Sequence, residues 1–493
     1  MQNGTRLAAV DLGSNSFRLE IGRYEFGHIQ RVEYLKETVR QGNGLDENRN
    51  LTQEAMERGW ACLARFGERL AGFPRTQVRA VATQTLREAR NREEFLSRGS
   101  QMLGYPIDVI SGLEEARLIY QGVARLLAQS DERRLVVDIG GRSTELIVGQ
   151  QFTPHAVASF RVGSVAWSQR YFAYGEFTPG AFAAAEIAAK AVLDEAVETF
   201  HSGAWEVAYG SSGTAGAVGE VLAVAGQAPS GVITRSGLDW LHDRLLRAGS
   251  ADRLRIDGLK EERRAVIGGG ISVLRAVFDL LEIDEMQVAQ GALRQGALYD
   301  LLDREQPGTD LRSATVQGLM ERFGVDTEHA QRVAATALNL FEQARGPDSA
   351  RAALKLQWAA RLHEIGCRIS HSDYHRHGAY ILDNTDAAGF AVPELHRLGV
   401  LVLGQRGKVR KLDTDLTDPV FALQLLCLRV AVALCHARRA PDTQGLTLRR
   451  DGMGFRLQAR PGWALAYPQS AHLLREEMAA WQKTPWELTV DLG

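Results

Sequence analysis

The sequence predicts an α/β protein of two similar halves, followed by a mostly helical part and a small α+β piece at the C-terminal end. Three observations lead to this fold class. Strand-like and helix-like segments alternate through the first third of the chain, and the alternation restarts at Leu135. Each half opens with an apolar run that ends in Asp, one spacer residue and Gly. From about Leu311 the apolar residues take the spacing of helices.

The first half, expected over residues 1–120, alternates strands and helices in chain order. Apolar or alternating runs predict strands at 7–13, 17–24 and 28–39. Helical spacing of apolar residues predicts a helix within 52–73, with Thr52 as its N-cap. Strand-then-helix segments follow at 77–89 and 106–127.

The second half, expected over residues 121–303, repeats this order and indicates a duplicated domain. Strands are predicted at 134–141 and 144–150, and a long helix from about Gly180 to Phe200. Strand, glycine turn and helix follow at 206–222, with further segments at 261–281 and 285–302. The polar stretch 303–312 contains a Pro-Gly pair and is a plausible linker.

The remainder divides into an expected helical domain, 311–445, and a small α+β domain, 446–493. Apolar spacing predicts helices at 313–325, 327–345 and 353–369. Residues 454–465 and 485–492 have the pattern of strands.

Composition excludes several classes of protein. With 493 residues the chain is long enough for two to four domains at roughly 100–200 residues each. A formal net charge of -2 produces no global basic field, so no nucleic-acid partner is expected. The four cysteines are scattered without a CxxC pair, which indicates neither a disulfide framework nor a zinc ribbon.

The termini and apolar runs predict a cytoplasmic protein. The stretch MQNGTRLAAVDLG has no charged region followed by a long apolar segment, so no signal peptide is expected. No run of 18 apolar residues predicts a spanning helix. Peripheral association with a membrane surface stays open.

The two glycine turns carry the chemistry. LAAVDLGSNSFRLEIG and LVVDIGGRSTELIVG both leave a strand through an Asp, turn on Gly and reach short hydroxyl side chains. Glycine lets phosphate oxygens approach backbone N–H groups, and the acids Asp11 and Asp138 suit Mg²⁺. Each turn alone has a plain alternative as a tight hairpin. Two matched turns, together with GSSGT at Gly210–Thr214, favour phosphate or nucleotide handling.

Six motifs in order resemble the exopolyphosphatase and guanosine pentaphosphate phosphohydrolase family, within the superfamily of actin, sugar kinases and Hsp70. They are AAVDLGSNSFRLEIG, VATQTLREARN, VISGLEEARLIYQGV, LVVDIGGRSTELIVG, GSSGT and GALRQGALYDL. The resemblance covers about residues 7–300 and continues more loosely to about 440. It implies two actin-like (ribonuclease H-like) domains, a helical HD-like domain and a homodimer.

The resemblance also implies roles for single residues. Glu115 matches the general base for the attacking water, although acids at a helix N-terminus are also favourable without any catalytic role. Arg87 matches a phosphate contact. Asp138 and Glu145 match positions that place Mg²⁺ and water, Asp11 is a further metal candidate, and K⁺ is a possible activator. The remaining phosphate-binding candidates are Asn15, Ser16, Gly140, Gly141, Arg142, Ser143, Thr144, Gly210, Ser212, Gly213 and Thr214. Arg117 is expected to pair with a neighbouring carboxylate.

Arg142 departs from the family, which has a small residue there. A side chain that points away from the cleft leaves substrate binding unchanged, whereas one that points in adds a cation for phosphate. We prefer the inward orientation.

The helical part holds a histidine-rich stretch and a basic one. His363, His371, His375 and His377 resemble the surroundings of an HD-type metal site, but Glu364 and Val432 stand where its two acids are expected. We therefore expect packing or polyphosphate contacts rather than a catalytic metal. Arg406, Lys408, Arg410 and Lys411 are either a solvated loop or a track for a polyanion.

The function predicted first is a processive exopolyphosphatase that hydrolyses terminal orthophosphate from linear polyphosphate by Mg²⁺-assisted water attack, with Glu115 as base. The alternative within the family is removal of the 5′-terminal phosphate of guanosine pentaphosphate, which gives the tetraphosphate. Retention of Glu115, Asp138 and Glu145 argues against a non-hydrolytic sensor of these compounds. The family's narrower motifs argue against an actin-like kinase.

Overall fold

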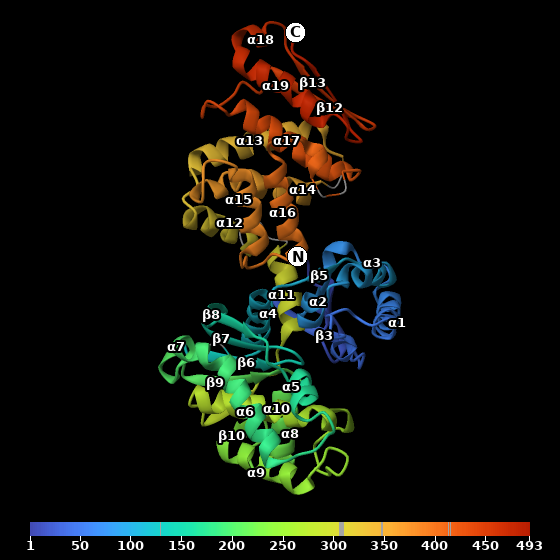
Figure 1. The fold of residues 1–493 in the computed structure, drawn as a ribbon, viewed down its shortest axis with the longest axis vertical. Coiled ribbons are helices and arrows are strands. Elements are labelled where there is room, and N and C mark those ends of the chain that lie inside the picture. The colour runs from blue at the N-terminus through green and yellow to red at the C-terminus, as the bar shows by residue number, and fades with distance from the viewer. Residues whose placement is uncertain (129, 305–309, 347–348, 413, 415) are drawn as a thin grey trace. The chain divides into compact units, whose positions relative to one another are not determined.

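The computed structural model describes residues 1–128, 130–304, 310–346, 349–412, 414 and 416–493. It divides into two compact units, Met1–Asp310 and Leu311–Gly493 (Figure 1). Of the predicted linker 303–312, residues 305–309 lie outside the described residues.

The first unit contains two sheets with the same strand order, which confirms the predicted duplication. The first sheet has the order β3-β2-β1-β4-β5. The second has the order β10-β11-β9-β6-β7-β8, so that β6, β7, β8, β9 and β11 repeat the arrangement of β1 to β5 and β10 adds an edge. The first-sheet strands are β1 (Arg6–Leu12), β2 (Phe17–Glu25), β3 (His28–Glu37), β4 (Val78–Ala82) and β5 (Ile107–Val109). The second-sheet strands are β6 (Arg133–Ile139), β7 (Thr144–Gln150), β8 (Thr153–Phe160), β9 (Val207–Ser211), β10 (Val232–Thr234) and β11 (Glu285–Val288).

Helices cover both sheets of this unit (Figure 1). They are α1 (Gln53–Leu70), α2 (Gln84–Glu88), α3 (Arg92–Leu103), α4 (Gly112–Ala124), α5 (Ser164–Tyr171), α6 (Pro179–Leu193), α7 (Val197–Phe200), α8 (Ser212–Val224), α9 (Arg235–Ala248), α10 (Ile267–Leu280) and α11 (Leu293–Arg304). The predicted cap of α1 is confirmed, because the Thr52 hydroxyl accepts a hydrogen bond from the Ala55 amide. The helix predicted from Gly180 to Phe200 is interrupted by a 3-10 turn at Asp194–Ala196.

Helices α4 and α11 join the two halves by direct backbone contact. A Cβ atom at Gly122 would overlap the Ala292 carbonyl oxygen, and one at Gly296 would overlap the Leu118 carbonyl oxygen. Beside this crossing, Arg117 pairs with Glu114 and Asp300, its nitrogens lying 2.8 and 2.6 Å from their oxygens. The expected pairing of Arg117 with a neighbouring carboxylate is thus confirmed. The first turn of α4 is therefore held from the side of α11.

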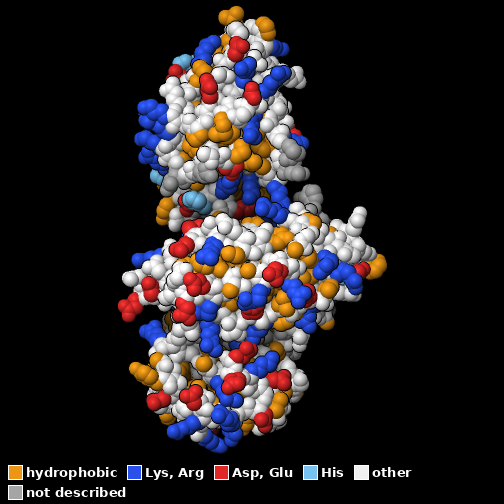
Figure 2. Space-filling model, turned by 90° about the vertical axis from the view of Figure 1, so that its right-hand side faces the viewer, with side chains coloured by type: hydrophobic (Ala, Val, Ile, Leu, Met, Phe, Trp, Pro, Cys, Tyr) orange, Lys and Arg blue, Asp and Glu red, His pale blue; other side chains and the backbone are white. Residues whose placement is uncertain are grey.

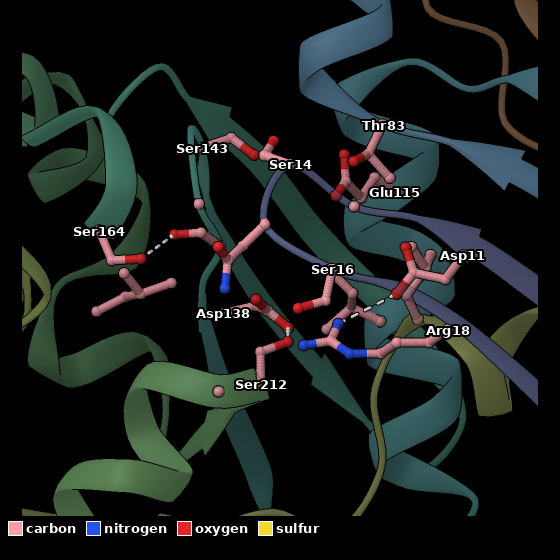
Figure 3. Close-up of a pocket in the computed structure, with 18 of the residues that line it drawn as sticks. Asp11, Ser14, Ser16, Arg18, Thr83, Glu115, Asp138, Ser143, Ser164 and Ser212 are labelled. Atoms are coloured by element: carbon pink, nitrogen blue, oxygen red, sulfur yellow. Dashed lines mark hydrogen bonds and ion pairs between the residues drawn. The ribbon is translucent and has the colours of Figure 1, made fainter. Parts of the chain in front are cut away.

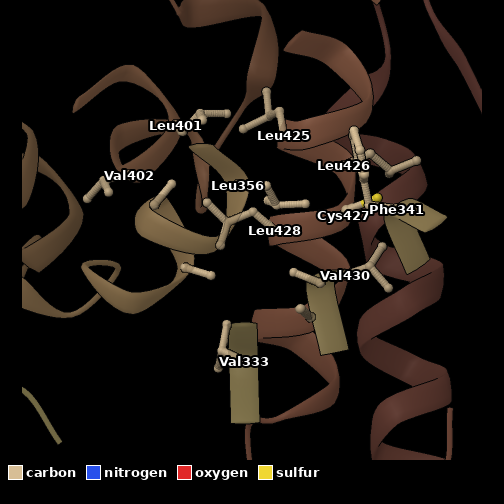
Figure 4. Close-up of a cluster of buried hydrophobic side chains, with 14 of the residues drawn as sticks. Val333, Phe341, Leu356, Leu401, Val402, Leu425, Leu426, Cys427, Leu428 and Val430 are labelled. Carbon is tan, nitrogen blue, oxygen red and sulfur yellow. The ribbon is translucent and has the colours of Figure 1, made fainter. Parts of the chain in front are cut away.

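The second unit packs helices and a small sheet around one continuous apolar core (Figure 4). Its helices are α12 (Leu311–Arg322), α13 (Thr327–Ala344), α14 (Ala350–Arg361), α15 (Tyr374–Asn384), α16 (Val392–Gly404), α17 (Pro419–Leu434), α18 (Trp463–Ala466) and α19 (Pro468–Trp481). The sheet has the order β12-β13-β14, with β12 (Leu446–Asp451), β13 (Gly454–Ala459) and β14 (Glu487–Asp491). Leu425 and Leu428 of α17 lie among the helical core residues in Figure 4, and Leu448 and Leu457 belong to the same cluster.

Two predicted elements of this unit are too long. The helix predicted at 353–369 ends at Arg361 and a 3-10 turn follows at Ile365–Arg368, where a Cβ atom on Gly366 would overlap the Tyr374 carbonyl oxygen. The strand predicted at 454–465 ends at Ala459, before Pro461 and the positive φ of 79° at Gly462. Tertiary packing at Gly366 and local chain geometry at Pro461 and Gly462 therefore override apolar spacing.

The surface agrees with the small net charge. On the face shown in Figure 2, acidic and basic side chains are interspersed over the first unit. Within the described part of the chain, no helix combines the length and apolarity needed to cross a membrane.

Candidate active site

A polar cleft between the two halves of the first unit brings together ten of the sixteen residues predicted for it, and Glu145 is not among its lining residues (Figure 3). The first half contributes Asp11, Gly13, Ser14, Asn15, Ser16, Arg18, Thr83, Glu115 and Ile119. The second half contributes Asp138, Ile139, Gly140, Gly141, Ser143, Ser164, Ser212, Gly213, Arg263 and Leu293. The lining contains two turns of the predicted type, one from each half.

The turns are built by equivalent hairpins. In the first, Asp11 on β1 lies opposite Arg18 on β2. In the second, Asp138 on β6 lies opposite Glu145 on β7, and the Gly140 amide donates to the Ser143 carbonyl at 2.9 Å. Because Asp138 and Glu145 are register partners in this hairpin, they are neighbours, although only Asp138 is part of the cleft lining.

The turn glycines serve close approach rather than unusual backbone angles. A Cβ atom at Gly13 or Gly140 would lie 3.0 or 3.1 Å from the carbonyl oxygen of Ser16 or Ser143. The positive φ of the cleft occurs instead at Ser212, with 64°, a strained conformation for a residue with a side chain. That conformation directs the Ser212 hydroxyl to Asp138, to which it donates at 2.6 Å (Figure 3).

Three carboxylates are buried together with little compensating charge. Burial, and then the proximity of Glu115 and Asp138, raise the pKa of Glu145 well above its ordinary value. Burial raises the pKa of Glu115 despite the opposing effect of Arg87, whose Nη1 lies 2.7 Å from Oε2. Burial also raises the pKa of Asp138, although Ser212 donates to it. A cation bound here would relieve this repulsion.

The donor set fits Mg²⁺. The predicted ligands Asp11, Asp138 and Glu145 offer only hard oxygen donors and are 3%, 3% and 1% exposed. Among the described residues they do not converge into a closed cage. This openness suits Mg²⁺, which keeps several waters and takes only one or two carboxylates besides substrate phosphate.

Two predicted phosphate-binding arginines are engaged by the protein itself. Arg87 donates to Glu115 and to the Ile110 carbonyl at 2.7 and 2.9 Å, so it orients the predicted base. Arg142 donates to Glu88 at 3.0 Å and to the Gly42 carbonyl at 3.2 Å, and neither arginine is part of the cleft lining. The inward orientation that we preferred for Arg142 is therefore corrected: the half-buried Glu88 carboxylate holds its guanidinium outside the cleft lining.

Three further predicted phosphate-binding residues do not line the cleft and instead make structural contacts next to it. The hydroxyls of Thr144 and Thr214 donate to the carbonyls of Val162 and Ile139 at 2.6 and 3.0 Å. Gly210 lies in β9, where a Cβ atom would meet Met286 and Ala215. The other candidates line the cleft, namely Asn15, Ser16, Gly140, Gly141, Ser143, Ser212 and Gly213. The buried Ser16 hydroxyl has no hydrogen-bond partner among the described residues.

The sequence analysis missed two cleft arginines. Arg18 lies 3.2 Å from Asp11, and its place in a strand pairing with Asp11 could have indicated it. Arg263 precedes α10, and no carboxylate of the described residues lies within ion-pair distance of it. Burial, and then Arg18, lower the pKa of Arg263. A Cβ atom on Gly213 would overlap its guanidinium, so Gly213 makes the room that Arg263 occupies.

The predicted residues of the second unit do not form one cluster. His363 is buried, whereas His371 is exposed and His375 and His377 are half-buried. Arg406, Lys408, Arg410 and Lys411 are exposed around the buried Val409.

The chain is similar to known proteins along nearly its whole length. The Ppx/GppA phosphatase family matches residues 21–305, and Ppx/GppA phosphatase, domain III, matches residues 311–480. A guanosine-5'-triphosphate,3'-diphosphate pyrophosphatase of Vibrio atlanticus is 38% identical over 489 residues, which cover 98% of each chain.

Solved structures share the fold. The Aquifex aeolicus member of the Ppx/GppA family is 25% identical with a TM-score of 0.52, and the match covers 61% of this chain and 99% of that one. An exopolyphosphatase of Cytophaga hutchinsonii is 24% identical with a TM-score of 0.55, covering 61% and 98%. The α/β part therefore has the actin-like fold that the sequence motifs implied.

Proposed function

The chain belongs to the Ppx/GppA phosphatase family, and we propose that it hydrolyses the 5′-terminal phosphoanhydride of guanosine pentaphosphate, releasing orthophosphate and the tetraphosphate. Linear polyphosphate, which the sequence analysis ranked first, is the second candidate. The order is reversed because the Vibrio relative, which matches over 98% of both chains, is named for the guanosine compound.

The observation that carries the proposal is the meeting of three buried carboxylates, Asp11, Glu115 and Asp138, with two glycine turns in one cleft. Backbone N–H groups and the hydroxyls of Ser16 and Ser143 suit the terminal phosphate, which needs donors that approach closely. The buried Ser16 hydroxyl, without a partner among the described residues, is available for this role.

Glu115 is the proton acceptor in this scheme. Its raised pKa brings a carboxylate closer to the operating pH, where a general base is most effective. Arg87 fixes the carboxylate, so that the proton of the attacking water is taken at a defined place. Asp138 and Glu145 would hold Mg²⁺, which when bound neutralises charge on the phosphoryl group.

A specific observation favours guanosine pentaphosphate, which carries phosphate groups at both its 5′ and its 3′ position, over linear polyphosphate. Arg18 and Arg263 come from different halves and face the same cleft, close enough to lower the pKa of Arg263. Arg18 is paired with Asp11, whereas Arg263 has no carboxylate within ion-pair distance among the described residues, so a further anion would stabilise Arg263. The 3′-diphosphate is such an anion, and a linear chain in the glycine turns does not require it.

We expect Arg263→Gln to lower kcat/KM for guanosine pentaphosphate by about 10- to 100-fold, the worth of a charge-assisted hydrogen bond, and for long polyphosphate by much less. The measurement is orthophosphate release from both substrates by the full chain. Arg264→Gln, which changes the neighbouring cation outside the cleft lining, is the matched control. Equal losses on the two substrates would contradict the preference for the guanosine compound.

A further inference from the structure

The second unit contains a cavity of about 620 Å³ that has no part in the proposed hydrolysis. His329, His363 and Glu364 are among its lining residues. One ligand atom from each of them lies within 4.8 Å of the others, and the two imidazoles are 6% and 1% exposed. Among the described residues, this is the one group of at least three His, Cys, Asp or Glu side chains with such spacing.

The group is built from two elements, with His329 on α13 and the other two residues in the turn after α14. Asp326 caps α13 by accepting from the His329 amide at 3.0 Å, which places His329 in the first turn. His363 and Glu364 follow the end of α14 at Arg361, in the turn before the 3-10 segment. Gln405 donates to the His363 carbonyl at 2.6 Å and holds this turn.

Both imidazoles have a nitrogen free for a ligand bond. His363 Nδ1 lies 2.8 Å from the Ala360 carbonyl, so Nδ1 carries the proton and Nε2 keeps its lone pair. His329 Nε2 lies 3.9 Å from Glu364 Oε1 and so faces the group, while Nδ1 of the same ring is buried without a hydrogen-bond partner among the described residues.

The Glu364 carboxylate is oriented by a charged partner, Arg438. Arg438 donates to both oxygens of Glu364 at 2.9 and 3.1 Å, and also to Asp326 at 2.9 Å. A carboxylate accepts about four hydrogen bonds, so lone pairs remain on Glu364 after these contacts. A backbone carbonyl behind one histidine and a charged partner behind the acid are the outer contacts typical of metal ligands.

We propose that His329, His363 and Glu364 bind one divalent transition-metal ion, in the first place Zn²⁺, with the remaining coordination position open to the cavity. Two imidazoles and one carboxylate select Zn²⁺ and its neighbours over Mg²⁺. Ligand atoms around tetrahedral zinc are roughly 3.4 Å apart for bonds of about 2.1 Å, so binding draws the three side chains together by small rotamer changes.

The test uses the full chain, stripped of metal with a chelator and then incubated with excess Zn²⁺ or Co²⁺. We expect it to retain one Zn²⁺ per chain after removal of excess metal, and Co²⁺ to give the visible absorption of a four- or five-coordinate site. The double variant His329→Gln/His363→Gln is expected to lose both signals. His371→Gln is the matched control, because His371 lines the same cavity but is exposed and outside the group.

Two results would overturn the proposal: a wild-type chain that retains no Zn²⁺, or a double variant that retains as much as the wild type. Should the double variant fail to fold, Glu364→Gln replaces it, with an expected loss of zinc affinity of at least tenfold and with unchanged affinity as the contrary result. Glu145→Gln separates the two sites, because changing this carboxylate of the first unit leaves zinc retention unchanged.

Discussion

Glu115→Gln lowers kcat for orthophosphate release by about 10²- to 10⁴-fold, the range of a general base, and leaves KM within about twofold. The amide keeps the size of the side chain and an oxygen that accepts from Arg87, but it does not accept the proton of the attacking water. The measurement is steady-state release of orthophosphate from guanosine pentaphosphate and, separately, from long polyphosphate.

The control is Glu94→Gln, an exposed acid in the first turn of α3. Both acids lie where a helix N-terminus favours negative charge, so the control separates that general effect from proton transfer. Glu115→Gln with wild-type kcat on both substrates would refute the assignment of the base, provided that thermal unfolding shows a folded variant.

Gly296→Ala destabilises the first unit by about 3 kcal/mol, because the new methyl group meets backbone that has no side chain to move aside. The Leu118 carbonyl oxygen occupies the place of this Cβ atom, so α4 and α11 must separate. Since α4 also carries Glu115, we expect kcat to fall along with stability, because misplacement of a catalytic group by about 1 Å can cost roughly 100-fold. The measurements are urea unfolding and orthophosphate release.

Gly216→Ala in α8 is the matched control for this substitution. Among the described residues, no atom outside the surrounding turns of α8 lies within 4 Å of a Cβ atom at Gly216, so alanine there gains helix propensity without a clash. We expect stability to rise by up to about 1 kcal/mol. If Gly296→Ala were as stable as Gly216→Ala, the close contact between α4 and α11 would be wrong.

The sequence predicted those features that depend on neighbours along the chain. Thr52 caps α1 because the capping hydroxyl and the amide it accepts from are close in sequence. The carboxylates Asp138 and Glu145 could be predicted to be neighbours because a short hairpin brings them opposite each other. The duplication was predictable because the same order of strands, turn and helix occurs in both halves of the first unit.

Features that depend on distant partners escaped prediction. Arg142 was given the wrong orientation because nothing near it in sequence indicates Glu88 as its partner. Arg263 stands in an ordinary run of charged residues, and only the fold brings it to Arg18. His329 lies on α13, far in sequence from the turn that carries His363, so the histidine-rich stretch was interpreted without this neighbour.

The break after Arg361 has a similar cause. Apolar spacing continues through 353–369, but the close approach of Gly366 to the Tyr374 carbonyl depends on tertiary packing. The sequence motifs also did not decide between the two substrates, because both substrates present a terminal phosphate to the same two glycine turns.

The most direct test of the account is single-turnover hydrolysis of guanosine pentaphosphate in ¹⁸O-labelled water. Water attack at the terminal phosphorus, with Glu115 accepting the proton, predicts one labelled oxygen in the released orthophosphate and none in the guanosine tetraphosphate. Label in the guanosine product, or unlabelled orthophosphate, would contradict it.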